Sequence, residues 1–189
     1  MHSRIHFREV VPSDFREMIK ILQSCYSSAD KMPISMDGTA IDNPEGPPWI
    51  WYGDAALFWQ LAEMDGQVLG FSLSRHVKRH VHLHAIFIDP KFQNLRIGQQ
   101  FMIRHWEQGI LEYPEVDSFS LGVYQKNIGG IRFYKKLGYQ ELDQSSIDPN
   151  QDNGLGDWVQ NCLSFNDWPL RDDAIFFIKF ASTIVPGKK

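Results

Sequence analysis

Hydrophobic and polar residues alternate along several short stretches of this chain, a pattern typical of β-strands with one buried face. These stretches are residues 4–8, 67–75, 80–88 and 118–124. Residues 55–63 and 139–142 and the apolar run 174–181 are also predicted to be strands, the last of them buried. Apolar residues recur at helical spacing in other segments, namely residues 12–25, 97–110 and 129–137. The order of the elements predicts a single domain over residues 1–189, of the α/β (α+β) class, with a mixed, mainly antiparallel central sheet flanked by helices.

Two polar, turn-rich stretches interrupt this pattern. The first, residues 27–53, is predicted to be mostly loop and contains Trp49, Trp51 and Tyr52. These aromatic residues are expected either to plug the core or to form the apolar wall of an acceptor pocket. The second, residues 143–173, is interpreted as an insertion between the last two strands. It is expected to be either a lid or an excursion packed down by its aromatic residues.

Composition and charge narrow the class of protein. The 189 residues carry a formal net charge of −4, so we expect no nucleic-acid partner. The chain contains no run of about 18 apolar residues and no apolar segment near its first residues, so we expect no membrane partner. Cys25 and Cys162 are too few for a disulfide framework. A cytoplasmic location is therefore expected.

Residues 82–99 combine a strand, a short polar loop and the start of a helix. Asp89 and Pro90 end the strand, because proline cannot donate to the ladder. The helix is predicted to begin near Ile97 or Gly98. Unpaired N–H groups and the positive end of the helix dipole meet at such a helix start, which makes it a phosphate-binding geometry.

This stretch resembles the acyl-CoA-binding signature of the GNAT family of N-acetyltransferases. Residues 88–90 (Ile-Asp-Pro) and 93–98 occupy the matching positions, with Arg96 at the place of the middle glycine. Residues 127–139 resemble the family's second motif, with Gly130 in place of alanine. The resemblance implies the acyl-CoA N-acyltransferase (GNAT) fold and acetyl-CoA as the acyl donor, and it also allows a homodimer.

The resemblance assigns the donor to two segments. Main-chain groups of residues 86–88 would pair with the pantetheine arm, and the N–H of Ile86 would donate to the developing oxyanion. Main-chain N–H groups of residues 94–99 would hold the pyrophosphate, and Asn127 would bind the pantetheine or fix the loop before its helix. The expected cofactor-binding residues are Ile86, Phe87, Ile88, Gln93, Asn94, Leu95, Arg96, Ile97, Gly98, Gln99 and Asn127.

Three histidines, His80, His82 and His84, alternate along the strand and share one face. His82 and His84 are candidate general bases, about 6.5–7 Å apart along the strand, which permits action through water. Alternatively, the histidines decorate a half-exposed face or bind a metal, although their fanned spacing does not favour a tetrahedral site. The His-Leu-His run is similar to arylalkylamine (serotonin) N-acetyltransferases, in which two such histidines are implicated in deprotonating the amine.

Tyr134 is the candidate general acid. A phenol with an ordinary pKa near 10 stays protonated and can donate to a departing thiolate whose acid has a pKa of about 8.5. The resemblance assigns this role to the tyrosine at this place in the motif. The alternative is a core tyrosine on a short helix.

Together these features predict an N-acetyltransferase that moves an acetyl group from acetyl-CoA to the primary amine of a small molecule. Direct attack in a ternary complex is expected, with no metal and no covalent intermediate, because neither cysteine lies in the motifs. Two alternatives remain. Arg96 and Gly130 favour a non-catalytic acyl-CoA-binding or regulatory module. A protein (N-terminal or lysine) acetyltransferase would need an open acceptor groove.

Overall fold

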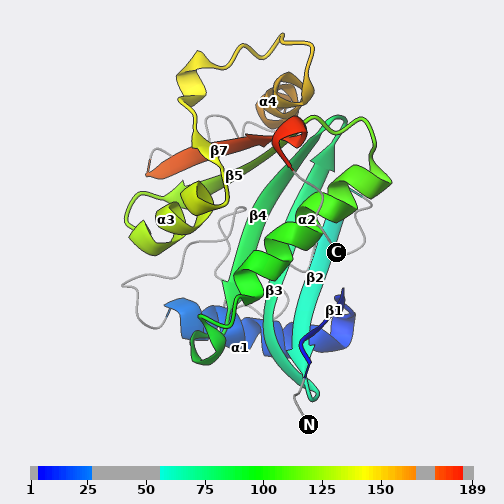
Figure 1. Ribbon diagram of the computed structural model, residues 1–189, viewed down its shortest axis with the longest axis vertical. Coiled ribbons are helices and arrows are strands. Elements are labelled where there is room, and N and C mark those ends of the chain that lie inside the picture. The colour runs from blue at the N-terminus through cyan, green and yellow to red at the C-terminus, as the bar shows by residue number, and fades with distance from the viewer. Residues whose placement is uncertain (1–3, 27–55, 165–172, 185–189) are drawn as a thin grey trace. The chain divides into compact units, whose positions relative to one another are not determined.

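A computed structural model describes residues 4–26, 56–164 and 173–184 of the chain (Figure 1). The described strands are β1 (His6–Glu9), β2 (Leu57–Met64), β3 (Gln67–Val77), β4 (His80–Ile88), β5 (Ser118–Tyr124), β6 (Gln140–Glu141) and β7 (Ala174–Phe180). The described helices are α1 (Phe15–Tyr26), α2 (Ile97–Glu112), α3 (Ile128–Lys136) and α4 (Gly154–Ser164), with short 3-10 turns η1 (Pro12–Asp14), η3 (Pro90–Phe92), η4 (Gln144–Ser146) and η5 (Ala181–Thr183).

The strands form one sheet in the order β1-β2-β3-β4-β5-β7-β6. The β4–β5 pair is parallel, whereas β1–β2, β5–β7 and β6–β7 are antiparallel. The predicted mixed, mainly antiparallel sheet with flanking helices is therefore confirmed. By its internal contacts the chain divides into two compact units, each described by itself. The first unit is residues 1–73 with 85–102, and the second is residues 74–84 with 103–189.

The first unit is built around the β2–β3 hairpin and α1. Asp65 and Gly66 connect the strands with φ of 52° and 79°, the left-handed pair typical of a two-residue hairpin turn. One face of α1 packs on the strands, and the buried residues of this cluster are Val10, Met18, Ile21, Leu22, Trp59, Leu61, Phe71 and Leu73. Arg8 and Asp14 join β1 to the start of α1 through an ion pair of 2.7 Å.

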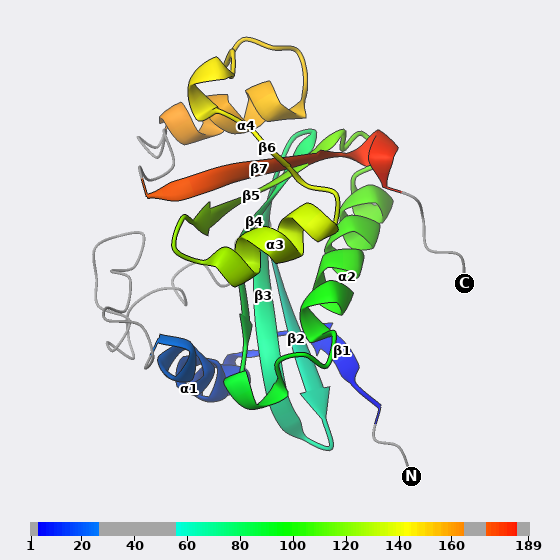
Figure 2. The same ribbon diagram turned by 60° about the vertical axis from the view of Figure 1, so that its left-hand side comes forward.

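The second unit is built around β5 and β7. Figure 2 shows α3 and α4 on opposite sides of this strand pair. The α4 side carries a cluster of buried residues, namely Ile147, Leu155, Trp158, Val159, Cys162, Phe176 and Ile178. The α3 side carries Phe177, with Lys135 Nζ 5.9 Å from its ring centroid, and Lys179, which donates to the Leu137 carbonyl at 2.8 Å. Gly138 (φ 83°) follows α3, as the sequence predicts for a residue that ends the helix.

Helix α4 is the main element that the sequence pattern did not predict, because residues 143–173 were interpreted as a turn-rich excursion. Asn153 caps this helix by accepting from the Gly156 N–H at 2.9 Å. Trp158 is only 2% exposed, so this residue packs down, which is compatible with either of the two alternatives. None of the helices in the described ranges combines the length and hydrophobicity needed to cross a membrane.

Candidate functional site

The loop between β4 and α2, in the first unit, has a well-defined backbone. Asp89 donates its N–H to the Leu69 carbonyl at 2.9 Å, and its side chain accepts from the Lys91 N–H at 3.0 Å. Asn94 and Arg96 then adopt left-handed conformations, with φ of 69° and 61°. These two residues turn the chain into the start of α2.

Arg96 occupies the place of a glycine in the family signature, and it also adopts the conformation that glycine favours. A left-handed φ costs a residue with a Cβ about 1–2 kcal/mol. The arginine therefore replaces the glycine without changing the local backbone class. Its side chain is exposed, so the positive charge is available to an anionic ligand.

The first turn of α2 can hold an anion through its main chain. Gln100 donates its N–H to the Arg96 carbonyl at 3.1 Å, so the N–H groups of residues 97–99 precede the first bond within the helix. Ile97 is 1% exposed and anchors this end in a cluster with Phe101 and Leu69.

The structure gathers ten of the eleven predicted cofactor-binding residues along this one segment of the first unit. Ile86, Phe87 and Ile88 are half-buried at the end of β4, whereas residues 93–96 and Gln99 are exposed. The Ile88 carbonyl already accepts from the Cys25 thiol at 3.3 Å and lies 3.5 Å from Gln93 Nε2.

The histidine cluster lies in the second unit, where His80 and His82 are buried and His84 is half-buried. His80 is 0% exposed and His82 is 5% exposed, which excludes the half-exposed face considered for them. His80 Nδ1 lies 2.8 Å from Ser118 Oγ and its Nε2 lies 2.6 Å from Ser120 Oγ. His82 Nδ1 lies 2.7 Å from the same Ser120 Oγ. The register of the parallel β4–β5 pair sets these contacts, because it places His80 opposite Ser118 and His82 opposite Ser120.

Helix α4 covers these rings with Trp158. The indole stacks on His82, with ring centroids 4.3 Å apart and an interplanar angle of 10°. It also stacks on His80 at 5.5 Å and meets His84 edge-on at 6.2 Å. Helix α4, which lies in the segment interpreted as an insertion, therefore supplies the side chain that covers the candidate base.

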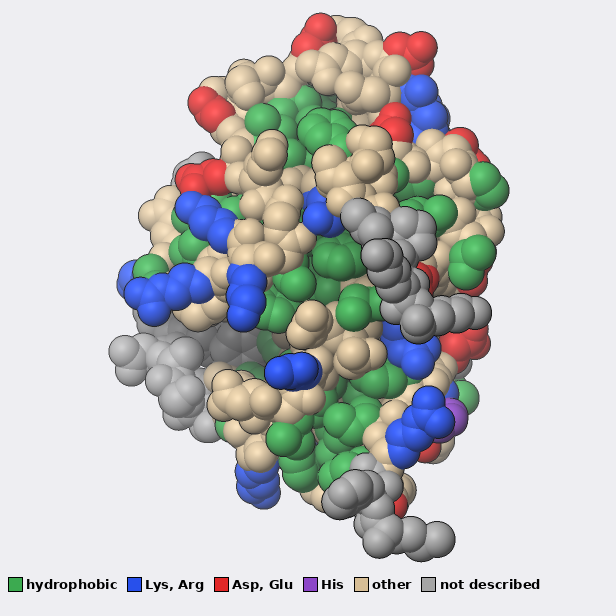
Figure 3. Space-filling model, in the orientation of Figure 1, with side chains coloured by type: hydrophobic (Ala, Val, Ile, Leu, Met, Phe, Trp, Pro, Cys, Tyr) green, Lys and Arg blue, Asp and Glu red, His purple; other side chains and the backbone are tan. Residues whose placement is uncertain are grey.

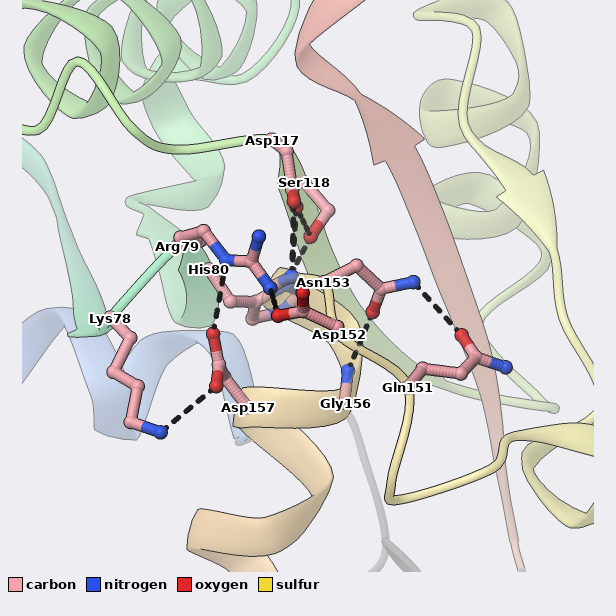
Figure 4. A network of polar contacts seen from close by, with 11 residues as sticks. Lys78, Arg79, His80, Asp117, Ser118, Gln151, Asp152, Asn153, Gly156 and Asp157 are labelled. Carbon is pink, nitrogen blue, oxygen red and sulfur yellow. Dashed lines mark hydrogen bonds and ion pairs between the residues drawn. The ribbon is translucent and has the colours of Figure 1, made fainter.

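The β3–β4 turn and Asp117, the residue before β5, hold the beginning of α4 (Figure 4). Asp157 pairs with Lys78 at 3.0 Å and with Arg79 at 3.4 Å. The Asp117 carboxylate accepts from the Gly154 N–H at 3.1 Å through each oxygen. A Cβ at Gly154 would lie 2.3 Å from the Arg79 carbonyl oxygen, so only glycine permits this close approach.

The histidines of the cluster are neutral near pH 7. Burial, with a smaller contribution from the positive charge of Arg75, lowers the pKa of His84 to about 4. Burial, followed by the neighbouring histidines, lowers the pKa of His82 well below its ordinary value. Their ring centroids are 5.0 Å apart, closer than strand spacing alone predicts. Within the described ranges, no group of three or more His, Cys, Asp or Glu side chains is arranged to hold a metal ion.

Asn127 and Tyr134 belong to α3, also in the second unit. Asn127 caps the helix, its Oδ1 accepting from the Gly130 N–H at 2.8 Å, which agrees with the loop-fixing alternative. A Cβ at Gly130 would lie 2.6 Å from Asn127 Nδ2, so the departure from alanine suits this cap. Burial raises the pKa of Tyr134, which keeps its phenol protonated and able to donate.

The sequence missed Ser118, Ser120, Asp117 and Trp158. A signal for the serines was present, because they alternate with the apolar residues of 118–124 and so face the same side as one another.

The predicted substrate-binding residues Trp49, Trp51 and Tyr52 lie outside the described residues. Figure 3 shows both positive and negative side chains among the described residues on the face drawn there.

Comparisons with solved structures agree on the fold. An acetyltransferase of the GNAT family from Staphylococcus aureus Mu50 superposes with a TM-score of 0.69 at 18% identity, covering 94% of this chain and 99% of that one. The PaiA N-acetyltransferase from Thermoplasma acidophilum, solved in complex with coenzyme A, gives 0.61 at 14% identity, covering 94% and 99%. The ribosomal-protein-S18-alanine N-acetyltransferase from Escherichia coli gives 0.60 at 16% identity, covering 96% and 97%.

Sequence comparison gives the family. The chain is 30% identical over 102 residues to an uncharacterized N-acetyltransferase of Methanocaldococcus jannaschii. That match covers 50% of this chain and 44% of the relative, so the chain spans less than half the length of this curated relative. The model of the acetyltransferase (GNAT) family matches residues 15–139, which is more than half of the chain. The chain therefore belongs to the acetyltransferase (GNAT) family.

Proposed function

We propose that this chain is an acetyl-CoA-dependent N-acetyltransferase that acetylates the primary amine of a small molecule by direct attack in a ternary complex. The observation that carries the proposal is the pair of neutral imidazoles of His82 and His84, 5.0 Å apart, on the strand that continues into the donor-binding signature. A buried neutral imidazole can accept a proton, whereas a protonated amine has no lone pair for attack.

In the proposed reaction, His82 or His84 takes the proton of the ammonium group, directly or through water. The amine then attacks the acyl carbonyl, whose developing oxyanion is held by the main-chain N–H of Ile86. As the C–S bond breaks, Tyr134 donates its phenolic proton to the departing thiolate, and the amide nitrogen gives its surplus proton to the resulting phenolate. The buried phenol of Tyr134 is protonated near pH 7, which a proton donor requires.

The first unit would hold the donor. The N–H groups of the first turn of α2 and the exposed side chain of Arg96 are both suited to pyrophosphate oxygens. Residues 86–88 would pair with the pantetheine amides as an added strand. Because the family model ends at residue 139, we also propose that residues 143–173 are an insertion in this chain.

The acceptor is to be identified by following thiol release from acetyl-CoA with a panel of amines. The panel contains arylalkylamines, polyamines, aminoglycosides, amino acids and short peptides. We expect turnover with one small-amine class, and kcat lower by about 10²–10⁴-fold in His84→Ala or Tyr134→Phe if the substituted residue is the base or the acid. Turnover with peptides alone would instead make the chain a protein acetyltransferase.

Calorimetry of acetyl-CoA binding tests the remaining alternative, a non-catalytic acyl-CoA-binding or regulatory module. Tight binding of acetyl-CoA without turnover of any amine would favour a non-catalytic binding module and contradict the proposal. The family resemblance allows a homodimer, and sedimentation velocity measures the oligomeric state directly. A cytoplasmic location is expected from the two free cysteines, Cys25 and Cys162.

A further inference from the structure

A continuous chain of hydrogen bonds connects a carboxylate to the candidate base inside the second unit. Its links are Ser118 Oγ to Asp117 Oδ1 at 2.8 Å, His80 Nδ1 to Ser118 Oγ at 2.8 Å, His80 Nε2 to Ser120 Oγ at 2.6 Å, and His82 Nδ1 to Ser120 Oγ at 2.7 Å. Both serines and His80 are 0% exposed, so water does not compete with these bonds. Figure 4 shows the Asp117 end of the chain.

The carboxylate fixes the direction of the first two links. Asp117 can only accept, so Ser118 must give it the single hydroxyl proton. Ser118 Oγ can then only accept from His80, which places a proton on His80 Nδ1. Burial lowers the pKa of His80 to about 3, so this ring is neutral near pH 7 and its Nε2 carries no proton.

The same reasoning fixes the last two links. His80 Nε2 accepts the hydroxyl proton of Ser120. Ser120 Oγ therefore accepts from His82, which places the proton of that ring on Nδ1. A neutral His82 with a proton on Nδ1 has its lone pair on Nε2.

We propose that Asp117 is a positioning residue that acts through Ser118, His80 and Ser120 to hold the proton of His82 on Nδ1, leaving Nε2 as the atom that accepts the amine proton. The inference rests on the proposed function and assigns the base to His82. In this step one N–H bond of the ammonium breaks, its electron pair stays on the amine nitrogen, and the proton binds His82 Nε2.

The chain also stabilises the imidazolium that forms. Each hydrogen bond polarises the next, so the charge of Asp117 reaches the Nδ1–H of His82 through two hydroxyls and one ring. The titratable groups that act on His82 are the histidines His84 and His80 from β4 and His105 from α2, and all three disfavour its protonation. Trp158 from α4 covers the ring and carries no charge. The carboxylate therefore opposes the effect of the surrounding rings.

Asp117 has a second contact that an experiment must separate from this one. It accepts the Gly154 N–H and so helps to hold the start of α4. Asp157 holds the same end of the helix through Lys78 and Arg79 but takes no part in the hydrogen-bond chain. Asp157→Asn is thus a matched control, which loosens α4 and leaves the chain to His82 intact.

The proton positions are measured by two-bond ¹H–¹⁵N correlation spectra of the full chain labelled with ¹⁵N-histidine, without acetyl-CoA or amine. At pH 7 we expect His80 and His82 to carry their protons on Nδ1, with the His82 signals assigned by their loss in His82→Gln. A wild-type His82 that carries its proton on Nε2 overturns the proposal.

Asp117→Asn preserves the shape of the side chain, but its amide can donate to Ser118 and so allows the whole chain to reverse. We expect the His82 proton to move to, or divide with, Nε2, and kcat to fall by about 10²–10⁴-fold with little change in the KM for acetyl-CoA. Asp157→Asn should keep the wild-type proton position and rate. If Asp117→Asn does not fold, Ser120→Ala removes the last link and should give the same shift.

The outcomes distinguish this inference from the proposed function. Unchanged proton positions and kcat in Asp117→Asn and Ser120→Ala would refute the positioning role while leaving the acetyltransferase intact. Equal losses of rate in Asp117→Asn and Asp157→Asn would show that Asp117 acts only by holding the start of α4, which would also refute the positioning role. If the wild type acetylates no amine, the proposed function fails, and the spectra alone still decide whether Asp117 orients His82.

Discussion

The donor loop (residues 89–99) and the histidine cluster (His80, His82 and His84) differ in what holds them in place. The donor loop is shaped by its own backbone, with left-handed turns at Asn94 and Arg96 and mostly exposed side chains. The histidine cluster is held by side chains that are distant in sequence, His82 and Ser120 being separated by 38 positions along the chain. A local motif can therefore reveal the first region, whereas the second depends on how the sheet pairs and on what α4 covers.

Replacing Trp158, which covers the histidine rings, should affect the histidine cluster and not the donor loop. It is the largest change we expect. Trp158→Ala leaves a cavity over His80 and His82, which should lower the free energy of unfolding by about 3–5 kcal/mol. Water that enters the cavity should raise the pKa of His82 toward its ordinary value. Urea denaturation and histidine NMR titration measure the two effects.

Leu163 is the matched control on the same helix, because it is 43% exposed. Leu163→Ala should change the free energy of unfolding by no more than about 0.5 kcal/mol. If Trp158→Ala costs no more than this control, α4 does not seal the cluster.

The next largest difference between the two regions should be in how their contributions to the free energy of unfolding depend on pH. A histidine whose pKa is lowered by folding stabilises the protein fully above the unfolded-state value of about 6.5 and loses that contribution as the pH falls toward its folded-state pKa. For His84, with a folded-state pKa of about 4, the window is therefore about pH 6.5 to 4. For His80, with a folded-state pKa of about 3, the pH window extends down to about pH 3. We expect the free energy of unfolding to fall by at least about 2 kcal/mol between pH 7 and 5, the amount for one such histidine.

The first unit should lose its ion pair at lower pH. Arg8 lowers the pKa of Asp14 below its ordinary value of 3.8, so this contribution is present above that value and is lost only as the pH falls below it. Asp14→Asn should therefore keep the wild-type slope between pH 7 and 5 in urea denaturation. A flat stability profile in the wild type over this range would show that the cluster is not buried neutral.

The sequence predicted the elements of both regions but only one of the two arrangements. Alternation along residues 118–124 and the turn at Asp65 and Gly66 gave the strands and the hairpin correctly, because those signals are local. The donor segment was likewise predicted from the order of strand, loop and helix start. The pairing of His80 with Ser118 depends on strand register, which no local pattern specifies. Helix α4 was missed because its capping residue, Asn153, lies in a run of turn-forming residues.

The smallest effect we expect lies in the donor loop, at Arg96, and it separates backbone strain from ligand contact. Arg96→Gly removes the penalty of the left-handed conformation but adds freedom to the unfolded chain, so it should stabilise the protein by roughly 0.5–1 kcal/mol. Arg96→Ala retains the penalty and should be close to neutral. Both variants lose the guanidinium, so both should bind coenzyme A about 10-fold more weakly by calorimetry if Arg96 contacts a phosphate. Tighter binding in both variants would mean that the arginine crowds the donor, and tighter binding in Arg96→Gly alone would assign the effect to the backbone.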